Sequence, residues 1–247
     1  MHVSNTLLAG VLVAASGALS ACTTTADHNP TDPYESFNRS MYTFNDGVDR
    51  AVLQPVAKGY RAVTNKPIRE GVGNFLGNLK EPITAANQLL QGKPADAGAA
   101  AGRFVINTTV GVIGFFDTAS ALGIDRKTED FGQTLGVWGV HPGPYLVLPL
   151  LGSTNPRDLF GMFGDAALNP LNYPQFDGDA ATRIGIGVAG AISGREAAIE
   201  TVEGVRDQVD PYTTVRRFSV RNRALAVGNM ELAPVELDKV SDDELNF

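Results

Sequence analysis

A run of 26 residues, Phe131 to Pro156, contains no Asp, Glu, Lys or Arg. By length the run could cross a bilayer, since a transmembrane helix needs about 20 apolar residues. It contains four prolines, however, and each one removes a backbone donor, so a lipid-exposed helix would leave carbonyl groups unpaired. We therefore expect a broken helical hairpin, either buried in protein or lying at an interface. A buried hairpin in the core of a soluble protein fits the pattern equally well.

Helix-start signals dominate the remainder of the chain. Prolines suited to the first turn of a helix recur along it: Pro33, Pro55, Pro67, Pro82, Pro94 and Pro211. Strand evidence is confined to Tyr145–Leu151, and Pro149 interrupts that segment. These signals predict an all-α fold.

The first predicted helix begins at Asp32-Pro33, where Asp32 would be the N-cap. Apolar residues then recur at intervals of three and four, which places them on one helical face: Phe37, Met41, Phe44, Val48 and Val52. We expect this face to pack against the rest of the fold.

The N-terminus resembles a secretory signal. Its apolar run, Leu7 to Leu19, has 13 residues, which is the length of a signal-peptide core and too short for a membrane span. Leu19-Ser20-Ala21-Cys22 follows, and small residues before a cysteine resemble the lipobox of bacterial lipoproteins. The resemblance implies cleavage before Cys22 and lipidation of Cys22. Ordinary cleavage near Ala21 is the alternative.

Composition excludes several classes of function. The net charge of −7 argues against nucleic-acid binding, which requires a basic face. One cysteine and three histidines make a structural zinc site improbable, so we expect no metal.

There is no G-x-S-x-G motif, and His141 is the sole histidine in the predicted domain, so we expect no enzyme activity. The segment Gly185–Gly190 matches G-x-G-x-x-G but lacks a preceding strand, and it is better explained as a small-residue helix face.

Two charged features lie near the C-terminus. Four arginines occur on the last predicted helix: Arg216, Arg217, Arg221 and Arg223. They are either a solvated face near a helix C-terminus or a contact for lipid phosphates or an acidic partner. The segment from Glu231 to Phe247 has six acidic residues and one lysine, and we expect a solvated tail.

Six segments in order resemble one family, the MlaA/VacJ outer-membrane phospholipid-transport lipoproteins. The match covers nearly all of the chain from Asp32 to about Ala226. It is carried by DPYESFNRSMYTFND (32–46), QPVAKGYR (54–61), NFLGNLKEP (74–82), RFVINTTVGVIGFFD (103–117), DFGQTLGVWGVHPGPYLVLPLLG (130–152) and DPYTTVRRFSVRNR (210–223).

The resemblance implies a ring of helices that lies in the plane of the outer membrane of a Gram-negative bacterium, on its periplasmic side. A central amphipathic channel would take mislocalised phospholipids from the outer leaflet and pass them to a soluble periplasmic carrier protein. The family's association with trimeric porins implies a porin partner. No cofactor is implied. A non-transporting lipoprotein that scaffolds a porin is the alternative function.

The expected organisation and sites follow from these inferences. Residues 1–21 would be the signal peptide, 22–31 a lipidated tether, 32–228 the helical domain and 229–247 the acidic tail. Phe37, Phe44 and Asn45 are the channel or gating candidates, with the two aromatic rings inside the ring of helices. The hinge candidates of the hairpin are Gly139, Pro142, Gly143, Pro144, Leu148, Pro149 and Leu150.

Overall fold

The structure, a computed structural model, describes residues 32–173 and 179–229. Its α-helices are α2 (Glu35–Val48), α3 (Gln54–Val63), α4 (Lys66–Asn78), α5 (Glu81–Leu90), α6 (Pro94–Thr109), α7 (Thr118–Ala121), α8 (Phe131–Val137), α9 (Pro156–Leu168), α10 (Asp179–Ala197), α11 (Ile199–Arg206) and α12 (Pro211–Val227). A π-helical turn, η1 (Asp49–Leu53), joins α2 to α3, and a 3₁₀ turn, η2 (Pro170–Asn172), follows α9. The predicted all-α class is confirmed.

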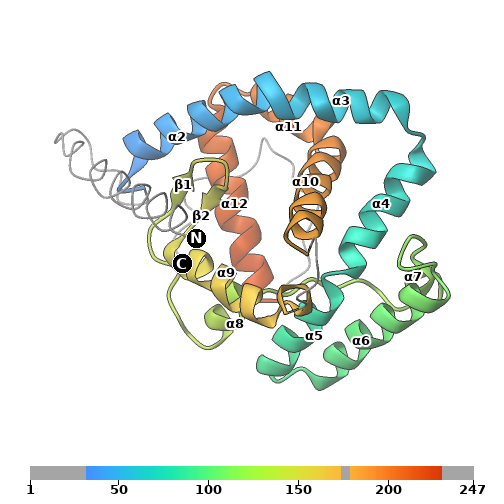
Figure 1. Ribbon diagram of the computed structural model, residues 1–247. Coiled ribbons are helices and arrows are strands. Elements are labelled where there is room, and N and C mark those ends of the chain that lie inside the picture. Colours follow the sequence, from blue (N-terminus) through green and yellow to red (C-terminus); the bar gives the residue numbers. More distant parts are fainter. Residues whose placement is uncertain (1–31, 174–178, 230–247) are drawn as a thin grey trace, which may run out of the picture.

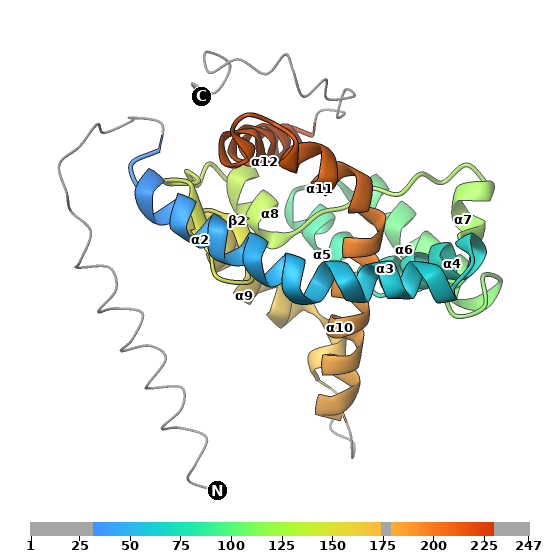
Figure 2. The ribbon, with the colours of Figure 1, turned by 90° about the horizontal axis from the view of Figure 1, so that it is seen from above.

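The helices follow one another around a ring (Figure 1). The continuous rod of α2 and α3 forms one side, α4 turns the corner, and α5 and α6 form the side opposite the rod. The elements α8, α9 and α12 lead back to α2. Seen from above, α12 lies on one side of the ring, and the beginning of α10 projects from the other (Figure 2). Among the described residues, none of the helices combines the length and apolar character needed to cross a membrane.

Proline at the first turn begins most of the predicted helices. Pro55, Pro67, Pro82, Pro94 and Pro211 all occupy the first or second position of a helix, where the missing N–H has no intrahelical partner to lose. One predicted start is wrong in detail, since helix α2 begins at Glu35 after Tyr34 instead of capping on Asp32. Pro55 lies in the first turn of α3 as predicted, but α3 continues directly from α2 through the π-helical turn.

The uncharged run from Phe131 to Pro156 differs from the expected helical hairpin. Its first part is the short helix α8, and its second part is an antiparallel pair of strands, β1 (Leu146–Leu148) and β2 (Gly152–Thr154). The register pairs Leu146 with Thr154 and Leu148 with Gly152. Pro149 lies in the connecting turn, where it costs no ladder hydrogen bond, so the proline that weakened the strand prediction marks the turn of a β-hairpin.

The interior of the ring wall is polar. The largest fully buried side chains are Arg103, Gln88, Asn38, Asn78, Asn87, Asn107, Thr134 and Asp32. The buried apolar cluster is small and consists of Tyr145, Val147 and Tyr212, against which Met41, Tyr42 and Val220 pack. Many large apolar side chains are instead exposed, among them Phe163, Ile184 and Leu122 at 70, 67 and 66%. This distribution is the reverse of the one expected for a water-soluble domain.

Ion pairs hold the rod of α2 and α3 to α10 and α11. Arg195 and Arg206 both contact Asp49, at 2.7 Å each. Further along the rod, in α3, Arg61 contacts Glu196 at 2.6 Å. Glu196 is buried and also forms an ion pair with Arg69 of α4, at 3.0 Å. These bridges fix the position of α10 against the rod.

Candidate functional site

The β-hairpin is attached to α2 through two asparagine side chains. Asn38 donates from Nδ2 to the carbonyl oxygen of Tyr145 at 3.0 Å, and its Oδ1 accepts from the amide of Val147 at 2.8 Å. Two turns later, Asn45 donates to the carbonyl oxygen of Leu148 at 2.9 Å and accepts from the amide of Leu150 at 2.7 Å. Each carboxamide therefore satisfies one donor and one acceptor of the hairpin backbone, as a neighbouring strand would.

The turn of the hairpin is strained at one residue. Leu150 has a φ of +63°, a left-handed conformation that costs a residue with a β-carbon about 1–2 kcal/mol. Its side chain is 74% exposed, so contacts of that side chain within the chain do not offset the cost. The hydrogen bond from the Leu150 amide to Asn45 is the contact that holds this conformation.

The other hinge candidates lie in the connection between α8 and β1. Gly139 and Gly143 have φ values of +88° and +74°, and a β-carbon at Gly143 would stand 3.1 Å from Pro156. The Pro142 carbonyl accepts from the Arg157 amide at 3.3 Å, and Pro144 is half-buried. Only Leu148, Pro149 and Leu150 lie at the turn that Asn45 holds, so the structure divides the predicted hinge residues into two groups.

The aromatic candidates on α2 are partly exposed. Phe44 is 49% exposed, and Phe37 is half-buried. Of the residues on this helix only Asn38 is fully buried. Neither aromatic ring is fully buried, because the face of α2 that meets the hairpin is the asparagine face. The position of Phe37 and Phe44 inside the ring of helices stays a prediction.

Two carboxylates at the π-helical turn anchor the end of α2. Asp46 accepts from Arg206 Nε at 2.7 Å, and Asp49 accepts from Arg195 Nε and Arg206 Nη2 at the same distance. Partial burial alone would raise the pKa of Asp49, but the hydrogen bonds from the two arginines outweigh it and lower the pKa. Both carboxylates are therefore ionised, and they fix the orientation of the helix that carries Asn45.

A second buried ionic cluster joins α5, α6 and α7. Arg103, with a side chain 1% exposed, donates from Nε to Glu81 at 2.9 Å and from Nη2 to Asp117 at 2.9 Å. Its Nη1 donates to Ser120 and to the carbonyl oxygen of Ile124. Burial opposes ionisation of Asp117, yet hydrogen bonds from Ser120 and Arg103 lower its pKa to about 2. The cluster is a structural joint, since each of these groups is directed at another group of the protein.

The arginines of α12 are not a uniform solvated face. Arg216 is buried and lies 3.9 Å from Asp32. Arg223 contacts Asp130 and Asp158, each at 2.6 Å, and so ties α12 to the starts of α8 and α9. The acidic groups that these two arginines face belong to the protein itself, so the expectation of a solvated face is wrong for them.

Three further expectations concern Cys22, the acidic tail and a metal site. Cys22 and the acidic tail lie outside the described residues. Among residues 32–173 and 179–229, no group of three or more His, Cys, Asp or Glu is arranged to hold a metal ion.

Sequence reasoning missed Asn38, Asp46 and Asp49. A signal for Asn38 was present, because Asn38 and Asn45 are seven residues apart and therefore share a helical face. The apolar residues at helical spacing drew attention to a different face of the same helix. Asp46 has one local partner, Arg50, four residues later in the chain. The other partners of Asp46 and Asp49 are Arg195 and Arg206, about 150 residues away, and no local pattern points to them.

Comparison with known proteins gives a consistent picture. The family model described as MlaA lipoprotein matches residues 30–226. A protein of Haemophilus influenzae named intermembrane phospholipid transport system lipoprotein MlaA is 38% identical over an alignment of 255 residues, which covers 98% of each chain. The Escherichia coli protein of the same name is 36% identical and covers 83% of this chain and 82% of its own. An uncharacterized protein of Rickettsia typhi, RT0044, is 39% identical over 79% of this chain and 78% of its own.

A solved structure shares the fold. It comes from work on the structural basis for maintenance of bacterial outer membrane lipid asymmetry, and it superposes with a TM-score of 0.71 at 34% identity. The match covers 79% of this chain and 98% of the solved chain.

Proposed function

This chain belongs to the MlaA lipoprotein family, and on that premise we propose that it removes mislocalised phospholipids from the outer leaflet of the outer membrane and passes them to a periplasmic carrier. The relatives named after intermembrane phospholipid transport support the general function. Such movement would maintain lipid asymmetry and would require no bond to be made or broken.

The single observation that carries the proposal is the reversed distribution of polar and apolar side chains. Buried Arg103, Asn38 and Asn87 have hydrogen-bond partners within the protein, while Phe163 and Ile184 are largely exposed. A hydrocarbon surrounding favours exposed apolar side chains and demands that polar groups be satisfied internally. A ring built this way suits a position within the lipid layer, with its helices lying in the membrane plane.

The proposed route for the head group runs through the ring beside the asparagine face of α2 and the hairpin. Asn45 and the hairpin turn would form its adjustable element, because one carboxamide holds a strained turn there. Phe44 is half exposed beside Asn45 and would contact the lipid as it passes.

The exposed apolar residues at the ends of α5 and α8 are the surface we propose for a trimeric porin. They are Leu89, Leu90, Val137, Trp138 and Val140. Trp138 Nε1 donates to the carbonyl oxygen of Leu90 at 3.0 Å. This hydrogen bond holds the ends of α5 and α8 next to each other, so their apolar residues form one surface. Lipidation of Cys22 would hold the ring at the periplasmic side of the outer membrane.

Deletion of the gene, followed by measurement of surface-exposed phospholipid with an added phospholipase, tests the function. We expect the deletion to raise the phospholipid accessible at the surface and the wild-type chain to restore it. A second measurement follows labelled phospholipid from vesicles that contain the purified protein to a soluble acceptor. Unchanged surface phospholipid and no transfer from vesicles would together refute transport and favour a porin-scaffolding lipoprotein.

A further inference from the structure

An uncharged loop follows α6 and leads toward α7 at the edge of the ring (Figure 1). The chain from Phe104 to Phe116 contains no Asp, Glu, Lys or Arg. Its last seven residues, 110–116, lie beyond the end of α6, and we call them the apolar loop. Four of its side chains are large, apolar and more than half exposed: Val110, Val112, Ile113 and Phe116.

Two β-branched residues of the apolar loop have a left-handed backbone. The φ angle is +54° at Val112 and +58° at Ile113, and Gly114 follows at +87°. Glycine and asparagine tolerate this conformation, whereas a β-branched residue in it is strained. Val112 and Ile113 are 59 and 65% exposed, so packing within the chain does not explain the choice of residue. Strained backbone of this kind is typical of functional segments, and what it provides here is two exposed aliphatic side chains.

The two buried glycines hold the apolar loop in place. A β-carbon on Gly111 would stand 2.2 Å from the carbonyl oxygen of Phe116, and one on Gly114 would stand 2.7 Å from Cβ of Asn78 in α4. The backbone of the loop therefore packs directly on itself and on α4, while the larger side chains remain exposed.

The backbone amides of the apolar loop are largely satisfied within the protein. Six of the seven amides from Val110 to Phe116 donate to backbone carbonyl oxygens. Gly114 donates to Asn107 at 2.7 Å, and Phe116 donates to Gly111 at 2.8 Å. Hydrocarbon offers no hydrogen bonds, so irregular backbone is tolerated at membrane depth only where the protein supplies the partners. A loop surrounded by water has no such requirement.

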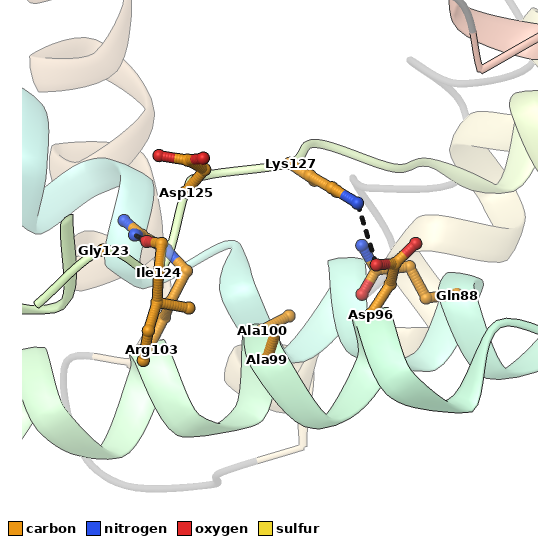
Figure 3. A pocket seen from close by; sticks show the side chains of 9 residues that line it. All are labelled: Gln88, Asp96, Ala99, Ala100, Arg103, Gly123, Ile124, Asp125 and Lys127. Atoms are coloured by element: carbon orange, nitrogen blue, oxygen red, sulfur yellow. Dashed lines mark hydrogen bonds and ion pairs between the residues drawn. The ribbon is translucent and has the colours of Figure 1, made fainter.

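The segment that crosses α6 is charged where the apolar loop is not. Figure 3 shows Asp125 and Lys127 on this segment, with Lys127 paired to Asp96 of α6 at 2.8 Å beside a cavity of about 240 Å³. Charged side chains are costly in hydrocarbon. The boundary between hydrocarbon and the polar layer would therefore run between Asp125 and the apolar loop.

We propose that the apolar loop inserts among the acyl chains of the membrane and fixes how deeply this edge of the ring sits. Its uncharged surface and paired amides match hydrocarbon, and its strained backbone presents Val112 and Ile113 to the lipid. The inference rests on the proposed position of the ring within the lipid layer and does not depend on lipid movement.

Fluorescent labels at two positions test the insertion. Cys22 is the sole cysteine, so Cys22→Ala gives a chain that can be labelled at Ile113→Cys or, as the control, at Asp125→Cys. The labelled protein is reconstituted in vesicles of phosphatidylethanolamine and phosphatidylglycerol that carry a spin label on either the acyl chain or the head group. We expect the acyl-chain spin label to quench position 113 more strongly, and the head-group spin label to quench position 125 more strongly. The same pattern at both positions would overturn the proposal, and so would a label at 113 that leaves water only when a trimeric porin is added.

Val112→Asn separates membrane insertion from folding. Asparagine relieves the strain, so the variant should unfold at a higher denaturant concentration than the wild type. It should also partition into the same vesicles at least about tenfold less, because one buried aliphatic side chain is lost. Val209→Asn makes the same change at a fully exposed residue between Asp207 and Asp210, and it should alter neither quantity. Unchanged partitioning of Val112→Asn would overturn the proposal, and the label at position 113 decides it should this variant fail to fold.

The insertion and the transport function fail separately. A chain whose label at position 113 lies among acyl chains but which transfers no lipid refutes transport alone. A chain that transfers lipid while position 113 remains in water refutes the insertion alone.

Discussion

The side chain of Asn45 accepts a hydrogen bond at 2.7 Å from the backbone amide of Leu150, a residue held at a φ of +63°. The same carboxamide donates to Leu148 on the other side of Pro149. One α-helical residue therefore holds both sides of a strained hairpin turn. The turn and helix α2 form one mechanical unit, which Asn38 extends to the first strand.

The two asparagines should differ in what they contribute to stability. Asn38→Ala would leave the Tyr145 carbonyl and the Val147 amide unpaired in a buried site, so we expect a loss of about 2–4 kcal/mol in the free energy of unfolding. Asn45→Ala should cost about 1 kcal/mol, because water can reach the exposed Leu150 amide. Denaturant unfolding in detergent measures both. Equal losses would contradict the view that Asn38 is the structural bond and Asn45 the adjustable one.

Phe44→Ala should be tolerated by the fold. A fully buried phenylalanine costs about 3–5 kcal/mol on truncation, but Phe44 is 49% exposed, so we expect about 1–2 kcal/mol. Contact with passing lipid predicts altered surface phospholipid at normal protein abundance, measured as phospholipase-accessible lipid per molecule of protein. Val63→Ala, at a site 83% exposed on the neighbouring helix, is the control. If lipid accessibility per molecule matched that of the control, the lipid-contact role of Phe44 would have to be given up.

The ionic joint at Arg103 predicts a specific sensitivity to acid. The folded-state pKa of Asp117 is about 2, below its ordinary value of 3.8, so its contribution is fully present above about pH 4 and is lost as the pH falls toward 2. A depression of this size corresponds to about 2–3 kcal/mol. Thermal unfolding between pH 5 and pH 2 should therefore fall more steeply for the wild type than for Asp117→Asn. Asp207→Asn should retain the wild-type slope, and a parallel fall for wild type and Asp117→Asn would contradict the assignment.

Removing the central arginine should be more damaging than removing one of its acidic partners. Arg103→Met leaves Glu81 and Asp117 with only the longer ion pairs from Arg126, at 3.6 and 3.5 Å, and breaking a buried pair in this way typically costs about 3–5 kcal/mol. The double variant Arg103→Met, Glu81→Gln should recover part of that loss. The free energy of unfolding of the two variants is the measurement, and a double variant less stable than the single one would show that charge is not the cause.

The helix boundaries were accessible from sequence because their causes are local. Proline at the first turn of α4, α5, α6 and α12 restricts the backbone whatever the tertiary surroundings. The left-handed residue after α5 was equally readable, since Gly92 has a φ of +75°. The resemblance to a family then supplied the ring, which these local signals do not imply.

The sequence did not predict which face of each helix is buried, because polar side chains are buried here and large apolar side chains are exposed. An apolar face at helical spacing is normally buried, and on that rule Phe44 and Val52 should be inside; they are 49 and 54% exposed. Asn38, with no apolar character, is the buried residue of α2. The ion pairs of Asp49 depend on partners distant in sequence, and the pairing of the two strands depends on the turn at Pro149. Hydrophobic periodicity detects neither.

The exposed apolar side chains should seat the ring in the membrane. Leu150 and Phe163 are 74 and 70% exposed, and a lysine in hydrocarbon costs about 2.5–3.5 kcal/mol at the centre of the layer. We expect Phe163→Lys and Leu150→Lys to lower the partitioning of the protein into liposomes by at least about tenfold, the equivalent of 1.4 kcal/mol. The measurement is co-flotation on a density gradient, made in a Cys22→Ala background so that acyl chains do not mask the effect. Thr201→Lys, at an exposed position between Glu200 and Glu203 of α11, should leave flotation unchanged. Equal flotation of all three lysine variants would show that these apolar side chains do not contact lipid, and the ring would then have to sit outside the hydrocarbon layer.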